Sequence, residues 1–279
     1  MYDIYEYIKE QKQSLGRYIS QIPNINLLVD MKGNIGDHLI WAGTKKLLDD
    51  LRVPYQKISI QQIENRKIKG TENGCLLIPG SGAFDMRWHE WLPQLVIDAS
   101  KMFEKVLILP SAFDVSVPIV KECLHQENVY AFAREPVSFC AIKSIGNASL
   151  SFDCALYFDF DKYRKSNSAG VLCALRDDAG SLIDRKTYTL SAFNNDISLT
   201  THSLDEWLMR IAKASLVITD RLHVAAASIM LKKELIYLDP YNNKISTYLD
   251  YIFSKTAPER VKKVDCQWLL SEKYISGGV

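Results

Sequence analysis

The chain has 279 residues, of which 47% are hydrophobic and 24% charged, and this balance is typical of a soluble globular protein with one large or two modest domains. Its 34 basic and 33 acidic residues give a net charge of +1, which argues against the strongly basic face that nucleic-acid binding needs. No stretch is apolar for the roughly 20 residues of a membrane span, and no signal-peptide pattern opens the chain. We therefore expect a cytoplasmic protein.

The six cysteines include no C-x-x-C pair, and several lie inside apolar runs, where a thiol behaves as a small hydrophobic group. This favours reduced, buried cysteines over disulfides or a zinc site. The chain also lacks the clustered histidine and cysteine spacing of structural metal sites, so we expect no metal and no cofactor. A Mg²⁺ ion held by carboxylates remains an alternative.

Apolar and aromatic residues recur at helical spacing over residues 2–21, which predicts an amphipathic helix. The favoured interpretation is a helix that covers the surface of the first core. The alternative is a peripheral contact with a membrane or a partner, made by the tyrosines and by the basic Lys9, Lys12 and Arg17.

Short apolar runs, polar turns and helical patterns alternate along the rest of the chain. In the first half, strands are predicted at 26–30, 55–60, 75–79, 106–109 and 129–133, and helices at 39–51 and 90–103. After a polar stretch at 159–169 the alternation restarts, with strands at 170–175, 216–219 and 234–238 and helices at 203–214, after 219, at 245–253 and around 267–270.

This rhythm predicts an α/β protein with two Rossmann-like domains, whose mainly parallel sheets face each other across a cleft. We place the domains at 1–165, with the leading helix, and at 166–279. Ligands of such sheets bind outside the carboxyl ends of the strands, so the site is expected in the cleft.

A glycine-rich turn, KGNIGDHL, follows the first predicted strand. Gly33 and Gly36 allow the backbone to turn tightly and to approach a ligand, and Asp37 is placed to cap the helix that follows. Asn34, Asp37 and His38 carry more polar groups than a structural turn requires. We expect a phosphate or sugar site at this helix N-terminus.

A second glycine-rich loop follows the strand at 75–79, where Ser81 lies between Gly80 and Gly82. In a parallel sheet this loop emerges at the same edge as the first one. Ser81 and Gly82 are therefore candidate ligand contacts.

The segment LVITDRLHVAAA at 216–227 combines an apolar strand with the start of an alanine-rich helix. We expect Asp220 to cap this helix. Arg221 and His223 then lie in its first turn, beside backbone N–H groups that hold anions.

Further charged residues follow other predicted strands, namely Arg134, Arg176 with Asp177, and Lys244. Arginine forks match phosphate and carboxylate groups, so the set favours a small ligand with more than one negative charge. His223 is suited to proton transfer near neutral pH.

Each of these side chains also has a purely structural interpretation. Arg134 would then pair with Glu135 and Arg176 with Asp178, in ordinary ion pairs at strand ends. His223 would be a hydrogen-bonded structural histidine.

Several motifs of the chain, in this order, resemble those of the polysaccharide pyruvyl transferases. They are GNIGDHL at 33–39, PGSGAF at 79–84, ILPSAF at 108–113, AREPVS at 133–138, FDCAL at 152–156, TDRLHVAAAS at 219–228 and the lysine of YNNK, Lys244. Ser81 stands where the family often has another glycine.

The resemblance implies a GT-B-like fold and transfer of pyruvate from phosphoenolpyruvate to a sugar of a growing surface polysaccharide or exopolysaccharide, as a pyruvate ketal. The first domain would face the acceptor and the second the donor. His223 would be the general acid, Arg221 and Arg176 would hold the anionic groups of the donor, and Asp37 would orient or deprotonate the sugar hydroxyl. The expected catalytic residues are His223, Asp37 and Arg221, and the expected binding residues are Asn34, Gly36, Ser81, Gly82, Arg134, Arg176, Asp177 and Lys244.

By the same analogy the acceptor is a lipid-linked oligosaccharide, which would bring the protein to the inner face of the membrane. Two alternatives remain open. One is a nucleotide-sugar glycosyltransferase, for which Asp239 is a poor match to the acidic residue that holds ribose hydroxyls. The other is a non-catalytic glycan-binding subunit of the same pathway.

Overall fold

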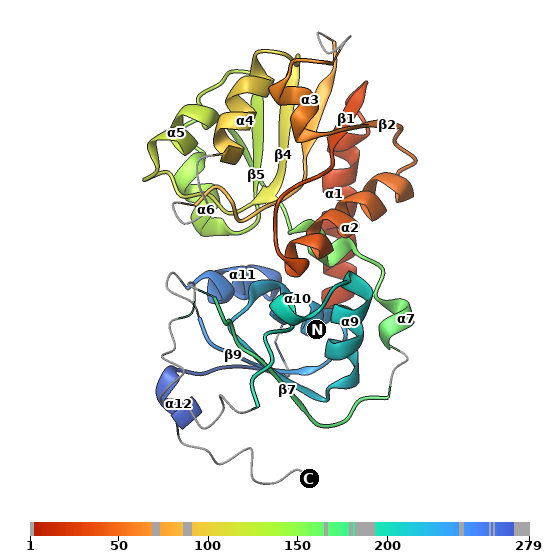
Figure 1. Cartoon of the computed structure of the whole chain (residues 1–279), viewed down its shortest axis with the longest axis vertical. Helices are drawn as coiled ribbons and strands as arrows, with labels where there is room; N and C mark the ends of the chain where they lie inside the picture. The colour runs from red at the N-terminus through yellow and green to blue at the C-terminus, as the bar shows by residue number, and fades with distance from the viewer. Residues whose placement is uncertain are drawn as a thin grey trace. The chain divides into compact units, whose positions relative to one another are not determined.

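In the computed structural model of the chain, two compact units are present (Figure 1). The N-terminal unit comprises Tyr2–Lys32 and Ile40–Phe158, and the C-terminal unit comprises Gly33–Leu39 and Asp159–Val279. The chain thus divides after Phe158, where the sequence analysis places the boundary after residue 165, and the glycine-rich turn groups with the later unit. The structure describes residues 3–68, 73–85, 91–164, 167–178, 181, 193–239, 243–256, 258 and 260–270.

The N-terminal unit contains a six-stranded parallel sheet with the strand order β2-β1-β3-β4-β5-β6. The order reverses between β1 and β3, and all residues of these two strands are buried, as expected for strands that are covered on both faces. The strands are β1 Ile25–Leu28, β2 Tyr55–Ile58, β3 Cys75–Ile78, β4 Lys105–Ser111, β5 Val129–Ala133 and β6 Asn147–Leu150.

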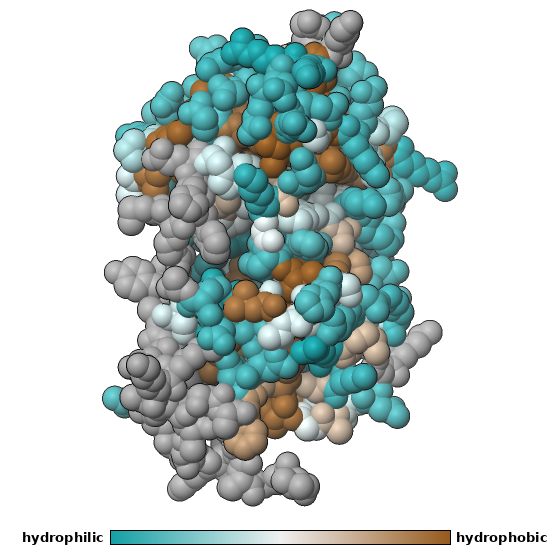
Figure 2. Space-filling model, in the orientation of Figure 1, coloured by the Kyte–Doolittle hydropathy of each residue, from teal (hydrophilic) through white to brown (hydrophobic). Residues whose placement is uncertain are grey.

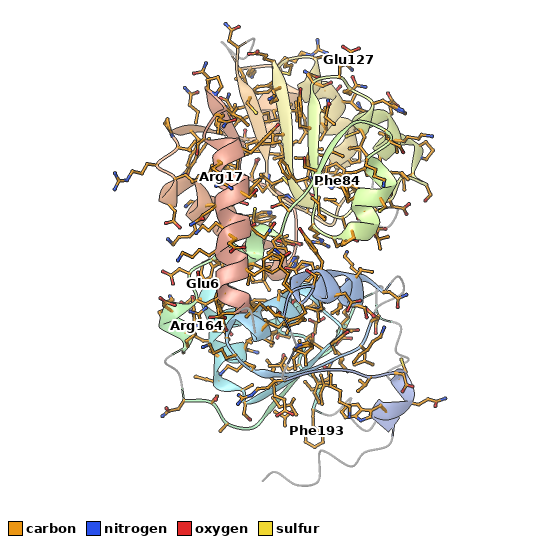
Figure 3. The ribbon with its side chains drawn as sticks, turned by 180° about the vertical axis from the view of Figure 1, so that it is seen from behind. Glu6, Arg17, Phe84, Glu127, Arg164 and Phe193 are labelled. Carbon is orange, nitrogen blue, oxygen red and sulfur yellow. The ribbon has the colours of Figure 1, made fainter. Side chains whose placement is uncertain are left out.

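Helices cover both faces of this sheet. Figure 1 shows α3, α4 and α5 on one face, and the view from behind in Figure 3 shows α1 on the other. The helices are α1 Ile4–Ile19, α2 Ile35–Asp50, α3 Ile60–Glu64, α4 Trp91–Ser100, α5 Pro118–Leu124 and α6 Pro136–Ile142, followed by the 3₁₀ helix η1 Cys154–Tyr157.

The apolar face of α1 packs on the core of its own unit. Leu15 and Ile19 are buried, the ring of Tyr7 contacts Phe152 edge-on at 4.9 Å between centroids, and Tyr18 contacts Phe132 at 5.3 Å. The prediction of a helix that covers core surface is therefore confirmed. The apolar side chains of Tyr7, Ile8, Leu15 and Ile19 are thus buried in the protein.

The C-terminal unit contains a four-stranded parallel sheet with the order β10-β9-β8-β7. Its strands are β7 Val171–Ala174, β8 Leu216–Thr219, β9 Glu234–Tyr237 and β10 Val261–Lys263, and its other helices are α7 Asp161–Arg164, α8 Ile197–Thr200, α9 Leu204–Lys213, α10 Leu222–Met230, α11 Lys244–Ile252 and α12 Cys266–Leu270. Two parallel sheets with helical connections confirm the predicted α/β class with two Rossmann-like units.

On the face drawn in Figure 2, hydrophilic side chains make up most of the described surface, with smaller hydrophobic patches among them. Within the described ranges, no helix is both long and apolar enough to cross a membrane.

Candidate functional site

The glycine-rich turn before α2 is held by a reciprocal pair of caps. The side chain of Asn34 accepts the N–H of Gly36 at 2.8 Å, and the Asp37 carboxylate accepts the N–H of Asn34 at 2.9 Å. Asn34 directly precedes α2, so Asp37 takes part in capping from the first turn of the helix and not from the residue before it. A Cβ atom on Gly33 would lie 2.6 Å from the Asp37 carboxylate, which explains the glycine.

His223 packs directly against this turn, within the C-terminal unit. Its Nδ1 atom lies 3.9 Å from Oδ1 of Asp37, and the two side chains are 11% and 22% exposed. A Cβ atom on Gly36 would lie 3.3 Å from Cβ of His223, so the close approach depends on glycine. The structure thus brings together three predicted site residues, Asp37, His223 and Gly36, from the first turns of two helices.

Asp220 does not cap α10, and this prediction is wrong. The N-cap is Arg221, for which no side-chain capping bond is found among the described residues. The Asp220 carboxylate instead accepts the backbone N–H of Arg176 at 2.6 Å and so joins the ends of β8 and β7. Burial raises the pKa of Asp220 to about 6, although the Arg176 N–H and the charges of Arg176 and Arg221 act in the opposite direction.

Arg221 is buried and held by a carboxylate that the sequence analysis missed. Asp196 accepts Nε of Arg221 at 2.6 Å and Nη2 at 2.5 Å, and Asp178 accepts Nη2 at 2.9 Å. Burial disfavours the charged guanidinium, but the hydrogen bonds and charges of the two carboxylates outweigh it and raise the pKa of Arg221. Arg221 is therefore a fixed cation.

Arg176 forms the ion pair with Asp178 that the structural interpretation predicted. Its Nε and Nη2 atoms donate to the two oxygens of Asp178 at 2.9 and 3.0 Å. Asp177 is exposed, and its backbone N–H donates to Asp196 at 2.7 Å. We call Arg176, Asp178, Asp196, Asp220 and Arg221 the β7–β8 cluster.

The two guanidiniums of the β7–β8 cluster are paired with Asp178 and Asp196, and the Asp220 carboxylate bonds the backbone N–H of Arg176, so the positive charge is balanced within the cluster. From the sequence, the arginines at the ends of β7 and β8 were expected to give a surplus of positive charge. The signal that could have found Asp196 is its place before a short helix, because its side chain caps α8 by accepting the N–H of Ser198.

Arg134 lies in the interior of the N-terminal unit. Its Nη1 atom donates to Asp153 at 3.1 Å, and the side chains are 1% and 0% exposed. Glu135, the partner expected under the structural interpretation, instead accepts the N–H groups of Val137 and Ser138 at the start of α6. Arg134 is thus buried in an ion pair with Asp153, and its role in ligand binding stays a prediction.

In the loop after β3, both the backbone N–H and the hydroxyl group of Ser81 form hydrogen bonds within the protein. The N–H of Ser81 donates to Ser111 at 3.0 Å, and Oγ of Ser81 accepts the N–H of Ala83 at 2.9 Å. Gly82 is partly exposed beside it. This loop flanks the point where the strand order of the sheet reverses, which is where ligands of such sheets bind.

Lys244 is the first residue of α11 and is partly buried. The start of this helix is held by Asp239, whose carboxylate accepts the N–H groups of Ile245 and Ser246 at 2.9 Å and pairs with Lys263 at 2.7 Å. Burial acts to raise the pKa of Asp239, but the bonds from Lys263 and Ser246 prevail and lower it. Asp239 is therefore committed to a structural role.

No group of three or more histidine, cysteine or carboxylate side chains in the described ranges is placed to hold a metal ion.

Comparisons with known proteins agree on the family and the fold. The family model of the polysaccharide pyruvyl transferases matches residues 34–242. A solved structure of an uncharacterized protein from Klebsiella pneumoniae subsp. pneumoniae NTUH-K2044 superposes with a TM-score of 0.71, at 20% sequence identity, over 95% of this chain and 100% of that one. None of the proteins with curated annotation matches. Because the family model matches well over half of its length, the chain belongs to the polysaccharide pyruvyl transferase family.

Proposed function

We propose that this protein transfers pyruvate from phosphoenolpyruvate to a sugar of a growing surface polysaccharide or exopolysaccharide, forming a pyruvate ketal. The observation that carries the proposal is the pairing of Asp37 with His223, 3.9 Å apart in the first turns of α2 and α10. Helix N-termini favour anions, and a carboxylate beside an imidazole is an arrangement suited to proton transfer.

In the proposed reaction, His223 protonates the methylene carbon of the donor as a general acid. A sugar hydroxyl, oriented by Asp37, attacks the resulting cationic C2 and gives up its proton to that carboxylate. Phosphate then leaves, and a second hydroxyl of the same sugar closes the ketal and gives its proton to His223, which had donated one, while Asp37 releases its proton to water. Arg221 and Arg176 hold the anionic groups of the donor, and the ion pairs with Asp196 and Asp178 orient their guanidiniums.

Other groups named from the sequence remain proposed contacts. Asn34 and Gly36 belong to the turn that carries Asp37, and Asp177 follows Arg176 directly. Ser81, Gly82 and Lys244 are proposed to contact the acceptor or the donor as well. The proposed acceptor is a lipid-linked oligosaccharide at the inner face of the membrane. A membrane contact through α1 gains no support, because Tyr7, Ile8, Leu15 and Ile19 of its apolar face are buried in the protein.

The test is phosphate release from phosphoenolpyruvate in the presence of an acceptor glycan. His223→Gln should lower the rate by about 10²–10⁴ while the donor still binds, because only the positioned acid is lost. The matched control is His202→Gln, since His202 is exposed and bonds Glu206 through its backbone N–H, which the substitution keeps. Near-native turnover of the His223 variant would remove the assignment.

A thermal-shift comparison separates the two alternative functions. Stabilisation by phosphoenolpyruvate but not by UDP- or GDP-sugars supports the proposal. The reverse result would favour a nucleotide-sugar glycosyltransferase, although Asp239 is committed to the start of α11. Binding of donor and glycan without phosphate release would favour a non-catalytic subunit.

A further inference from the structure

Asp178 is the carboxylate of the β7–β8 cluster that solvent reaches. Its side chain is 30% exposed, whereas that of Asp196 is 1% exposed. It accepts three hydrogen bonds from two guanidiniums, two from Arg176 at 2.9 and 3.0 Å and one from Arg221 at 2.9 Å. Two parallel bonds from one arginine to both oxygens are the geometry in which arginine recognises a carboxylate.

The orientation of Arg221 does not depend on Asp178. Two bonds to Asp196 hold its guanidinium, and Asp196 is itself held by the backbone N–H groups of Asp177 and Ser198. Arg221 would therefore keep its orientation if the short side chain of Asp178 rotated away, and the guanidinium of Arg176, which donates to Asp178, would be released toward an incoming carboxylate. An incoming carboxylate would meet strong repulsion from Asp178 if that side chain stayed in place.

We propose that Asp178 is an internal competitor whose place the carboxylate of the donor takes on Arg176 and Arg221. This inference rests on the proposed function, because phosphoenolpyruvate supplies the carboxylate. It assigns the cluster to the carboxylate end of the donor and leaves the phosphate to the helix N-termini beside Asp37 and His223. The affinity for the donor then depends on how much stronger the hydrogen bonds of the two arginines to the donor carboxylate are than their hydrogen bonds to Asp178.

The experiment measures the binding of pyruvate, which has the carboxylate but no phosphate, and of inorganic phosphate, by calorimetry. Asp178→Asn and Asp178→Ala should bind pyruvate on the order of 10-fold more tightly, because the competing charge is gone. The matched control is Asp161→Asn, which changes the net charge equally at an exposed ion pair with Arg164. Phosphate affinity should change only as much as in this control.

Two results would overturn the inference. One is a pyruvate affinity that equals that of the wild type or of the Asp161 control. The other is an equal gain for phosphate, which would mean that the cluster does not select the carboxylate. If neither Asp178 variant folds, as judged by thermal melting, Arg176→Ala carries the test, and it must weaken pyruvate binding.

A double-mutant cycle shows whether Asp178 acts through Arg176. In an Arg176→Ala background, Asp178→Asn should give less than half of its gain in pyruvate affinity, and a full gain would contradict direct competition. Turnover separates this inference from the proposed function. Phosphate release by the wild type with unchanged pyruvate binding in Asp178→Asn defeats the inference alone. Tighter pyruvate binding without any turnover of phosphoenolpyruvate defeats the proposed function and leaves the carboxylate subsite.

Discussion

Charged side chains at the ends of the strands are compensated one by one in this protein. Arg134 is matched by Asp153 and Arg221 by Asp196, and all four side chains are buried. Removing one partner of such a pair is far more costly than removing both, because an unpaired charge would be left buried. The arginines of the AREPVS and TDRLHVAAAS motifs thus each have a buried carboxylate partner.

Asp220 makes folding stability depend on pH. Its folded pKa of about 6 lies above the ordinary 3.8, so between these values the native state binds more protons than the unfolded state. Stability should therefore fall as the pH rises from about 4 to about 6 and then level off. Asp220→Asn lacks this step, so relative to the wild type it should gain up to about 3 kcal/mol between pH 4 and pH 7.

Urea unfolding of both proteins at pH 4, 5, 6 and 7 measures this difference. The wild-type curve is expected to lose stability, relative to the variant, in that pH window. Parallel pH profiles for the two proteins would show that burial does not shift the titration of Asp220.

The helix α2 lies very close to η1 at Gly43. A Cβ atom on its Gly43 would lie 1.8 Å from the backbone carbonyl oxygen of Cys154, at the start of η1. This oxygen cannot move aside as a flexible side chain can. The helix and η1 pack against each other at a distance that only glycine allows.

Gly43→Ala should therefore destabilise the protein by roughly 1–3 kcal/mol or more, despite the better helix propensity of alanine. The control is Gly16→Ala in α1, where the new Cβ meets only the end of the Leu51 side chain, at 2.8 Å. This variant should stay close to the wild type. Equal free energies of unfolding for the two variants, measured in urea, would argue against the close contact of α2 with η1.

All the predicted strands are present, including the edge strands β2 and β7, whereas the other two edge strands, β6 and β10, were missed. The run at 216–219 became β8 with the same bounds, because buried strands need continuous apolar residues. The strand β6 alternates between exposed and partly exposed residues, and β10 is the short and polar Val261–Lys263. An edge strand pairs on one side alone, so its residues need not be apolar.

Over the whole molecule, the reactivity of each cysteine thiol is expected to depend on whether it is buried in one of the two cores. All six cysteines lie in the described part of the chain and are free, and only Cys140 and Cys266 are exposed. Burial raises the pKa of Cys75 and Cys123 to about 12, and also raises that of Cys154. Since the thiolate is the reactive form, buried thiols should be inert.

A thiol titration with a disulfide reagent should therefore detect two cysteines in the native protein and six in denaturant. Cys140→Ser combined with Cys266→Ser should abolish the native reaction and leave four thiols after unfolding. Reaction of a third cysteine without denaturant would indicate that one of the cores opens on the timescale of the assay.

Local patterns of amino acids specify the class of this protein, its order of strands and helices, and the motifs that mark its family. These features depend on residues near one another in the chain, such as apolar runs, glycine turns and helix starts. The partners of the buried arginines, in contrast, lie far from them in the chain. Asp153 meets Arg134 because β5 and β6, the strands that precede them, pair side by side. Asp37 lies in the first turn of α2 and Asp196 at the start of α8, and only the packing of these segments brings them to His223 and Arg221. Many carboxylates are candidates for each arginine in the sequence, and only tertiary packing selects one.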